Sequence, residues 1–138
     1  MPAFYLDASA LVKLVLVEEE SEALRSYLAD AGLLSCELVL TEVPRAVRRA
    51  VPDDSAGLKR AALEQASKVL ESLALLPLER QLLIAAGAIA ESGLRALDAI
   101  HVAAAADLAP IDAFVTYDER QAAAARLAGL RTLAPGLV

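Results

Sequence analysis

Four acidic residues, Asp7, Glu42, Asp98 and Asp118, lie far apart in the sequence, and each adjoins an apolar segment. If folding brings them together, their repulsion raises their pKa values and destabilises the fold. A hard divalent cation such as Mg²⁺ or Mn²⁺ relieves this repulsion, because these ions prefer oxygen ligands. A cation held in this way activates water and stabilises charge on a phosphoryl oxygen. The four residues therefore form a candidate acidic metal site.

Two of these acids also have a simple structural explanation. Asp7 and Asp118 each follow an apolar run and precede a predicted helix, where an aspartate commonly caps the helix. Ser9 can cap the first helix instead, which would leave Asp7 free for other work. The residue types alone leave both interpretations open.

The other two acids lie within predicted helices. Glu42 could occupy the solvent face of an amphipathic helix and pair with Arg45 or Arg49. Asp98 falls in a first helical turn, where the helix dipole favours a carboxylate. The rest of that helix is almost wholly apolar, however, and burying an unpaired carboxylate is costly.

Cysteine and histidine occur once each, as Cys36 and His101. A zinc site is disfavoured because there is no cluster of Cys and His ligands. An internal disulfide is impossible, which favours a reducing, cytoplasmic location. We expect Cys36 to be a small buried hydrophobic residue rather than a catalytic thiol.

Hydrophobic periodicity predicts short strands that alternate with helices. Pro44 lies inside the third helix and predicts a kink beside Glu42; Gly32 ends the second helix, and Asp54 or Ser55 caps the fourth. The predicted strands cover residues 3–6, 33–36, 75–78, 113–116 and 130–133, and the predicted helices cover 9–16, 19–31, 37–51, 53–73, 79–92, 97–108 and 119–128.

This alternation is typical of a parallel sheet with helices on both faces, here a single α/β domain over residues 1–138. Ligands bind beyond the carboxyl ends of the strands in such sheets. Asp7 and Asp118 each follow a predicted strand, so we expect both at that edge.

Composition excludes two classes of protein. With 57% hydrophobic residues the chain is too apolar to be disordered. The longest apolar run, 82–90, is too short to span a membrane, and residues 1–7 do not resemble a signal peptide. The net charge of −6 weakens a nucleic-acid function, although basic residues gather at Arg45, Arg48, Arg49 and 59–60.

Four segments, in order along the chain, resemble PIN-domain ribonucleases, most closely the VapC-type toxins of toxin–antitoxin pairs. These segments are YLDASALVKL at 5–14, TEV at 41–43 with the arginines that follow, LDAIHVAAA at 97–105 and VTYDER at 115–120. The resemblance runs the full chain. It implies an α/β/α three-layer sandwich with a central parallel sheet, often assembled as a homodimer.

The resemblance also implies an activity and assigns roles. Asp7, Glu42 and Asp98 match the family's three acidic site residues, and Asp118 matches a fourth acid whose position varies more. Mg²⁺ or Mn²⁺ would serve an endoribonuclease that hydrolyses RNA phosphodiesters with metal-activated water and is inhibited by a VapB-type antitoxin. Ser9 and Thr116 match hydroxyl residues that support the carboxylates or the metal-bound waters.

Further residues could take part in that function. Lys13, Arg45 and Arg49, with Arg48 beside them, could contact RNA phosphates; a merely solvated basic face explains them equally well. His101 is a helical neighbour of Asp98 and could contact RNA or hydrogen-bond a carboxylate, although a structural role is favoured.

Two alternatives remain. The first is a catalytically silent module that keeps the fold and binds an antitoxin-like partner; the presence of all four acids disfavours it. The second is a phosphoryl-transfer domain. A haloacid-dehalogenase-like phosphatase needs an acid two residues after Asp7, where Ser9 stands, and the adjacent early acids of a receiver domain are absent.

Overall fold

The computed structural model describes residues 1–53, 57–91 and 93–137. Within these ranges the chain forms five strands and seven helices. The strands are β1 (Ala3–Leu6), β2 (Gly32–Cys36), β3 (Ala74–Leu76), β4 (Ala113–Val115) and β5 (Thr132–Leu133). The helices are α1 (Ala8–Val15), α2 (Ser21–Leu28), α3 (Val39–Ala50), α4 (Leu58–Glu71), α5 (Arg80–Gly87), α6 (Ala96–Leu108) and α7 (Glu119–Leu127).

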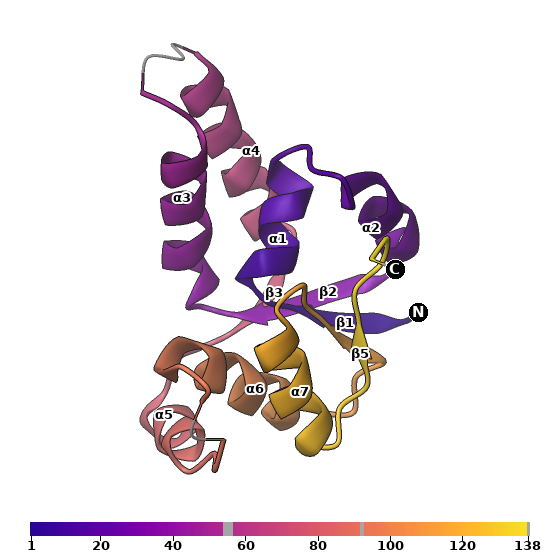
Figure 1. Ribbon diagram of the computed structural model, residues 1–138, viewed down its shortest axis with the longest axis vertical. Coiled ribbons are helices and arrows are strands. Elements are labelled where there is room, and N and C mark those ends of the chain that lie inside the picture. Colours follow the sequence, from indigo (N-terminus) through magenta and orange to yellow (C-terminus); the bar gives the residue numbers. More distant parts are fainter. Residues whose placement is uncertain (54–56, 92, 138) are drawn as a thin grey trace.

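The strands form one parallel sheet in the order β3-β2-β1-β4-β5. Helices α1 to α4 cover one face of this sheet and α5 to α7 cover the other (Figure 1). The predicted three-layer α/β/α sandwich with a central parallel sheet is therefore confirmed.

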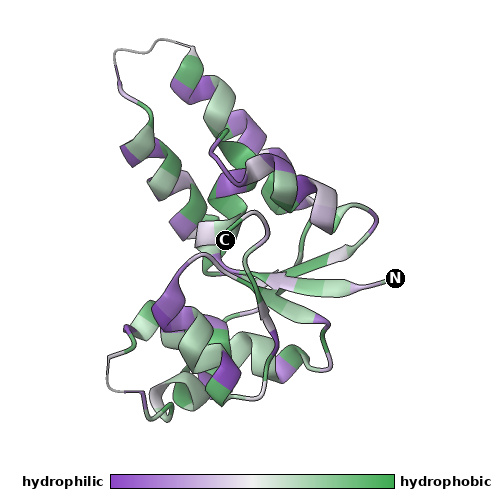
Figure 2. Cartoon of the chain, turned by 45° about the vertical axis from the view of Figure 1, so that its right-hand side comes forward, coloured by the Kyte–Doolittle hydropathy of each residue, from purple (hydrophilic) through white to green (hydrophobic). Residues whose placement is uncertain are grey.

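Alternating side chains of β1 supply the two cores. Phe4 and Leu6 pack beneath α1, α3 and α4, whereas Tyr5 packs on the opposite face against α6. β4 repeats the pattern, with Phe114 on the side of Tyr5. Successive strand residues point to opposite faces, so strands covered on both sides are apolar throughout, as the green central strands in Figure 2 show.

The strand order reverses direction at β1. The chain runs outward from β1 to β2 and β3, then crosses through α5 and α6 to return beside β1 as β4. The carboxyl ends of β1 and β4 are adjacent, with Leu6 level with Val115. A parallel sheet offers its natural ligand crevice at such a reversal.

Several predicted boundaries were wrong. The second helix ends at Leu28 rather than reaching Gly32, which instead starts β2. The fourth helix begins at Leu58, after Gly57 with a φ of 82°, and not at Asp53. The predicted caps Asp54 and Ser55 lie outside the described residues. α5 ends at Gly87, five residues before the predicted end.

α3 runs from Val39 to Ala50 with Pro44 inside it. Its buried stripe of Val39, Val43 and Val47 faces the α1–α4 side of the sheet. Glu42 precedes a stripe residue, which directs it to the edge of the packed face. Across the described residues, no helix combines the length and apolarity needed to cross a membrane.

Candidate active site

Asp7 follows the last residue of β1 and is only 2% exposed. Its Oδ1 accepts a hydrogen bond from the Ala10 N–H at 3.0 Å and thereby caps α1. The prediction that Ser9 caps this helix was wrong, because Asp7 occupies the extended position immediately before the first helical residue. Ser9 lies inside the helix and its hydroxyl donates to Asp7 Oδ1 at 2.6 Å.

Two hydroxyls tie Asp7 to the loop after β4. Thr116 Oγ1 donates to Asp7 Oδ2 and accepts from the Asp118 N–H, while Ser9 Oγ accepts from the Tyr117 N–H at 3.0 Å. Burial raises the pKa of the Asp7 carboxyl, and the hydrogen bonds from Ser9 and Thr116 oppose that rise. The carboxylate is thus held rigidly between β1 and β4.

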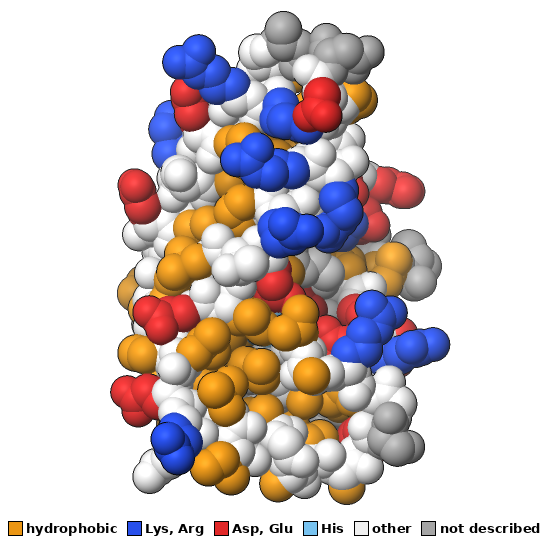
Figure 3. Space-filling view, turned by 90° about the vertical axis from the view of Figure 1, so that its left-hand side faces the viewer, with side chains coloured by type: hydrophobic (Ala, Val, Ile, Leu, Met, Phe, Trp, Pro, Cys, Tyr) orange, Lys and Arg blue, Asp and Glu red, His pale blue; other side chains and the backbone are white. Residues whose placement is uncertain are grey.

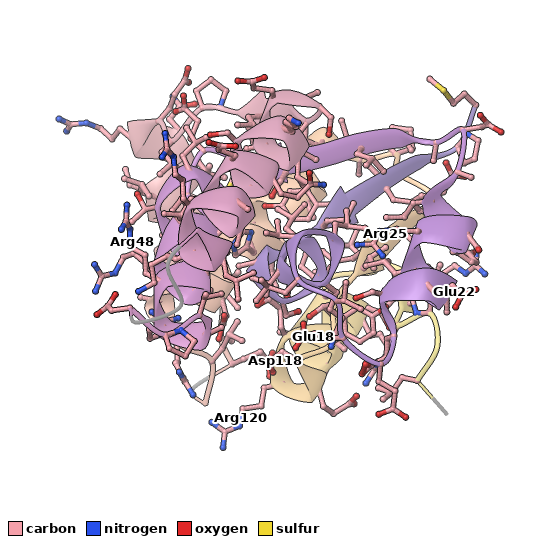
Figure 4. All side chains as sticks on the ribbon, turned by 90° about the horizontal axis from the view of Figure 1, so that it is seen from above. Glu18, Glu22, Arg25, Arg48, Asp118 and Arg120 are labelled. Atoms are coloured by element: carbon pink, nitrogen blue, oxygen red, sulfur yellow. The ribbon has the colours of Figure 1, made fainter. Side chains whose placement is uncertain are left out.

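Asp118 caps the last helix. Its Oδ1 accepts from the N–H groups of Arg120 and Gln121 at 2.9 and 3.3 Å. The residue remains half-buried, with its side chain at the N-terminus of α7 (Figure 4). Helix capping therefore accounts for both Asp118 and Asp7, and it leaves their predicted role in an acidic site open.

Asp98 is half-buried in the first turn of α6. Burial raises the pKa of this carboxyl, and the charges of Asp118 and Glu42 raise it further, against the opposing effect of His101 and Arg95. Asp98 is therefore within electrostatic reach of two of the other predicted site acids. Their common location at one site stays a prediction.

Glu42 does not pair with Arg45 or Arg49 among the described ion pairs. Its Oε1 instead lies 2.6 Å from His101 Nε2, joining α3 to α6 across 59 positions of sequence. Because His101 is 1% exposed, it offers no surface to RNA. Burial disfavours the charged ring, but hydrogen bonds to Cys36 and Glu42 and their charges raise the pKa of His101 to about 10.

The donor set fits a hard cation in chemistry. Oxygen ligands from carboxylates suit Mg²⁺ and Mn²⁺, and a cation would offset the like charges that raise the pKa of Asp98. Within residues 1–53, 57–91 and 93–137, no three Asp, Glu, His or Cys side chains stand close enough to ligate one ion as placed. The four-carboxylate metal site therefore stays a prediction.

A cavity of about 710 Å³ opens between α1 and α3, and of the four predicted site acids Glu42 is the one among its lining residues. Glu42 and Ser9 line it together with the three basic residues predicted to contact RNA, Lys13, Arg45 and Arg49. Figure 3 shows basic side chains along the upper half of this face, where α3 lies, acidic ones near its middle and hydrophobic ones below. Arg48 projects outward from α3 (Figure 4).

Lys13 is partly engaged within the protein. Its Nζ lies 3.3 Å from Glu20 and 3.7 Å from Glu18, and 4.7 Å from the centre of the Tyr117 ring. These contacts hold the lysine at the cavity wall. Its availability to a phosphate is lower than that of Arg45 or Arg49, for which no ion pair is found among the described residues.

Sequence reasoning missed two residues that contact His101. Tyr5 Oη is 2.8 Å from His101 Nδ1, and Cys36 Sγ is 3.8 Å from the same nitrogen. Tyr5 could have been noticed, because a buried tyrosine in an aliphatic strand needs a hydrogen-bond partner. Cys36 gave no signal beyond its predicted burial, which is confirmed.

A family model described as PIN domain matches residues 4–127. Ribonuclease VapC35 of Mycobacterium tuberculosis is 37% identical over 138 residues, with 96% of each chain covered. Ribonuclease VapC46 of the same organism is 38% identical over 137 residues, covering 98% of this chain and 99% of that protein. The chain therefore belongs to the PIN-domain family, within its VapC group.

Solved structures agree on the fold. PAE2754 from Pyrobaculum aerophilum superposes with a TM-score of 0.64 at 22% identity, covering 95% of this chain and 83% of that one. VapBC2 from Rickettsia felis, solved with a DNA fragment from its promoter, gives a TM-score of 0.67 at 14% identity and covers 96% and 98%. At these identities the likeness concerns the fold alone.

Proposed function

We propose that the protein is a Mg²⁺-dependent endoribonuclease that acts as the toxin of a toxin–antitoxin pair, with Mn²⁺ able to replace Mg²⁺. The observation that carries this proposal is the sequence identity of 37–38% over nearly the whole chain to proteins named VapC ribonucleases, and the acids Asp7, Glu42, Asp98 and Asp118 are proposed as its site. Two relatives named ribonucleases, each similar over nearly the whole chain, support the activity.

The four carboxylates would hold the cation. When bound, it would supply an activated water for attack on the phosphodiester and would stabilise charge on the phosphoryl oxygens. Ser9 and Thr116 keep the Asp7 carboxylate oriented through their hydroxyl hydrogen bonds. Glu42 is oriented from behind by His101. No side chain of the protein is required as a nucleophile.

The 710 Å³ cavity would receive the RNA strand. Arg45 and Arg49 lie on one face of α3 and line the cavity that Glu42 also lines. Guanidinium groups form strong paired hydrogen bonds with phosphate oxygens. The arginines would therefore bind the backbone of the RNA and bring a phosphodiester to the carboxylates, with Lys13 adding positive charge at the opposite wall.

Protein partners are also proposed, namely a VapB-type antitoxin and a second copy of the chain in a homodimer. Large apolar side chains on α5 and at the start of α6 are solvent-exposed: Leu83 by 45%, Ile84 by 65% and Leu97 by 48%. Exposed apolar groups are common at protein interfaces, and Figure 3 shows hydrophobic side chains gathered in the lower half of one face. The solved VapBC2 complex supports an antitoxin partner, and a cytoplasmic location follows from the same proposal.

The decisive experiment compares Asp98→Asn with Asp107→Asn, a control at the other end of the same helix. The first variant should lose RNA cleavage by at least about 100-fold, because removing a charge-stabilising group costs on the order of 3 kcal/mol in the transition state. The control should cleave as the wild type does. EDTA should stop cleavage and Mn²⁺ should restore it.

The outcomes separate the alternatives. Full cleavage by Asp98→Asn, or cleavage that persists in EDTA, contradicts the proposed function. A wild-type chain that binds an antitoxin but neither cleaves RNA nor slows growth would favour the catalytically silent interaction module.

A further inference from the structure

His101 lies at the centre of a buried hydrogen-bonded chain that begins at a predicted site carboxylate. Its Nε2 contacts Glu42 Oε1 at 2.6 Å, and its Nδ1 contacts Tyr5 Oη at 2.8 Å. An ionised carboxylate accepts hydrogen bonds and cannot donate them, so Nε2 must carry the hydrogen. This direction holds whether the ring is neutral or charged.

The inner end of this chain is anchored in the sheet. Tyr5 belongs to β1, is fully buried and stacks on Phe114 of β4 with ring centres 5.1 Å apart and planes 20° apart. The Tyr5 ring also meets the His101 ring edge-on, with centres 5.8 Å apart and a 74° angle. The imidazole of His101 therefore has little freedom to rotate, because it contacts Tyr5, and Tyr5 is itself fixed between the central strands β1 and β4.

Glu42 needs such support. Its side chain comes from α3, on the opposite layer to α6, and is 19% exposed at the cavity wall. No other hydrogen bond to the Glu42 side chain is found among the described residues. A glutamate has three rotatable bonds, so an unsupported carboxylate would swing outward into solvent.

We propose that His101 is a positioning residue: backed by Tyr5, it holds the Glu42 carboxylate at the site by donating from Nε2. These three hydrogen-bonded residues form the Tyr5–His101–Glu42 relay. The hydrogen bond engages Oε1, while Oε2 has no hydrogen bond among the described residues and stays available. Hydrogen bonds behind a carboxylate that holds a metal fix its orientation in this way.

A positioning role of His101 differs from that of a buried histidine whose hydrogen bonds only stabilise the fold. A histidine needed only for packing would be replaceable by another residue of similar volume, with no effect on Glu42. The relay instead ties the orientation of a carboxylate on α3 to a hydroxyl on β1. It rests on the proposed function for its catalytic consequence, but its geometry can be tested in the metal-free protein without RNA.

The first arm of the test is nitrogen NMR of the metal-free protein labelled with ¹⁵N-histidine. Because His101 is the only histidine, every imidazole signal comes from this ring. We expect Nε2 to carry its hydrogen and that hydrogen to exchange slowly with water. In Tyr5→Phe, which keeps the aromatic ring, the exchange should become at least about tenfold faster, since the ring loses one of its hydrogen bonds.

The second arm measures RNA cleavage. Tyr5→Phe should lower kcat about tenfold, equivalent to about 1.4 kcal/mol, while KM for the RNA changes less than about twofold. His101→Leu should lose more, and His101→Gln, which keeps an amide donor, should recover part of the loss. Tyr27→Phe is the matched control, because Tyr27 lies on the exposed side of α2.

The two arms fail separately. An Nε2 without a hydrogen, or a Tyr5→Phe variant with unchanged exchange and unchanged kcat, overturns the relay even if the wild type cleaves RNA. Equal losses in His101→Gln and His101→Leu also count against it. A wild type that does not cleave RNA overturns the proposed function, while the NMR arm still decides the relay.

Discussion

At the scale of single residues, two of the predicted site acids also cap helices. Asp7 caps α1 and Asp118 caps α7, and each follows a strand at the shared carboxyl edge. Capping explains why an aspartate is tolerated there, since it satisfies helix N–H groups.

The structural surroundings of the predicted site residues followed from the sequence where the signal was local. Asp7 and Asp118 stand directly after apolar strands. Asp98 could be recognised because it is an acidic residue in the first turn of an otherwise apolar helix. The partner of Glu42 was not predictable, because His101 lies 59 positions away and meets it only when α3 and α6 approach the sheet from opposite faces. The local expectation of an arginine three or seven residues along the helix was therefore wrong.

The charge of Asp98 should cost the metal-free protein stability. Burial, then the charge of Asp118, raise the folded-state pKa above the usual 3.8, so the folded chain binds this proton more tightly than the unfolded chain does. The loss of folding free energy is fully present above the pKa of Asp98 in the folded state. It disappears as the pH falls through that pKa towards the usual value of 3.8. Asp98→Asn should thus be more stable at pH 7, by less than about 1 kcal/mol because the group is partly exposed.

Thermal unfolding in EDTA at several pH values measures this difference, with Asp107→Asn as the control. The difference in thermal stability between Asp98→Asn and the wild type should become smaller as the pH is lowered. A variant that is less stable at pH 7, or a gap that widens in acid, contradicts the assignment of charge repulsion at this site.

At the scale of elements, α6 is the helix on which the site depends most. It carries Asp98 and His101, and its alanines allow close approach to the sheet: Ala104 and Ala105 are fully buried. The type and order of the elements followed from hydrophobic period, because each strand and each helix buries its own apolar face. The last residues of α2 and α5 and the first residue of α4 did not, because apolar residues of similar spacing continue beyond these boundaries.

Enlarging a buried alanine of α6 should push this helix away from the sheet. Ala104→Leu is expected to destabilise the fold by about 1–3 kcal/mol, because a close-packed core cannot take the added volume without strain. Ala106→Leu is the matched control, as Ala106 is exposed on the same helix. Urea unfolding of both variants tests this; equal stabilities would mean that α6 is not closely packed.

At the scale of the whole molecule, basic residues are concentrated on part of the surface. The net charge is −6, yet Arg45 and Arg49 line the cavity beside Glu42, and Figure 3 shows more basic side chains in the upper half of one face than in its lower half. A sum over the sequence therefore understates the attraction that a nucleic acid would meet locally. This distribution was visible only in part from the clustering of arginines along the sequence.

The two cavity arginines should govern the salt dependence of RNA binding. For single strands, each phosphate contact adds about 0.7 to the slope of log affinity against log salt concentration. The double variant Arg45→Gln/Arg49→Gln should therefore reduce the slope by about 1.4 and leave thermal stability unchanged. Binding titrations with a catalytically inactive Asp98→Asn background measure it, and Arg131→Gln, at an exposed position before β5, is the control. An unchanged slope in the double variant would remove these arginines from the binding site.

The pairing of β1 with β4 also determines when the surroundings of Asp7 can form during synthesis of the chain. β1 is made first, but its neighbour on the Asp118 side is residues 113–115, and the threonine that clamps Asp7 follows immediately. Until that stretch has left the ribosome, the hydroxyl that holds the Asp7 carboxylate is missing, however well α1 to α6 have formed. The Asp7 carboxylate therefore gains this hydrogen bond, which spans 109 positions of sequence, late in synthesis.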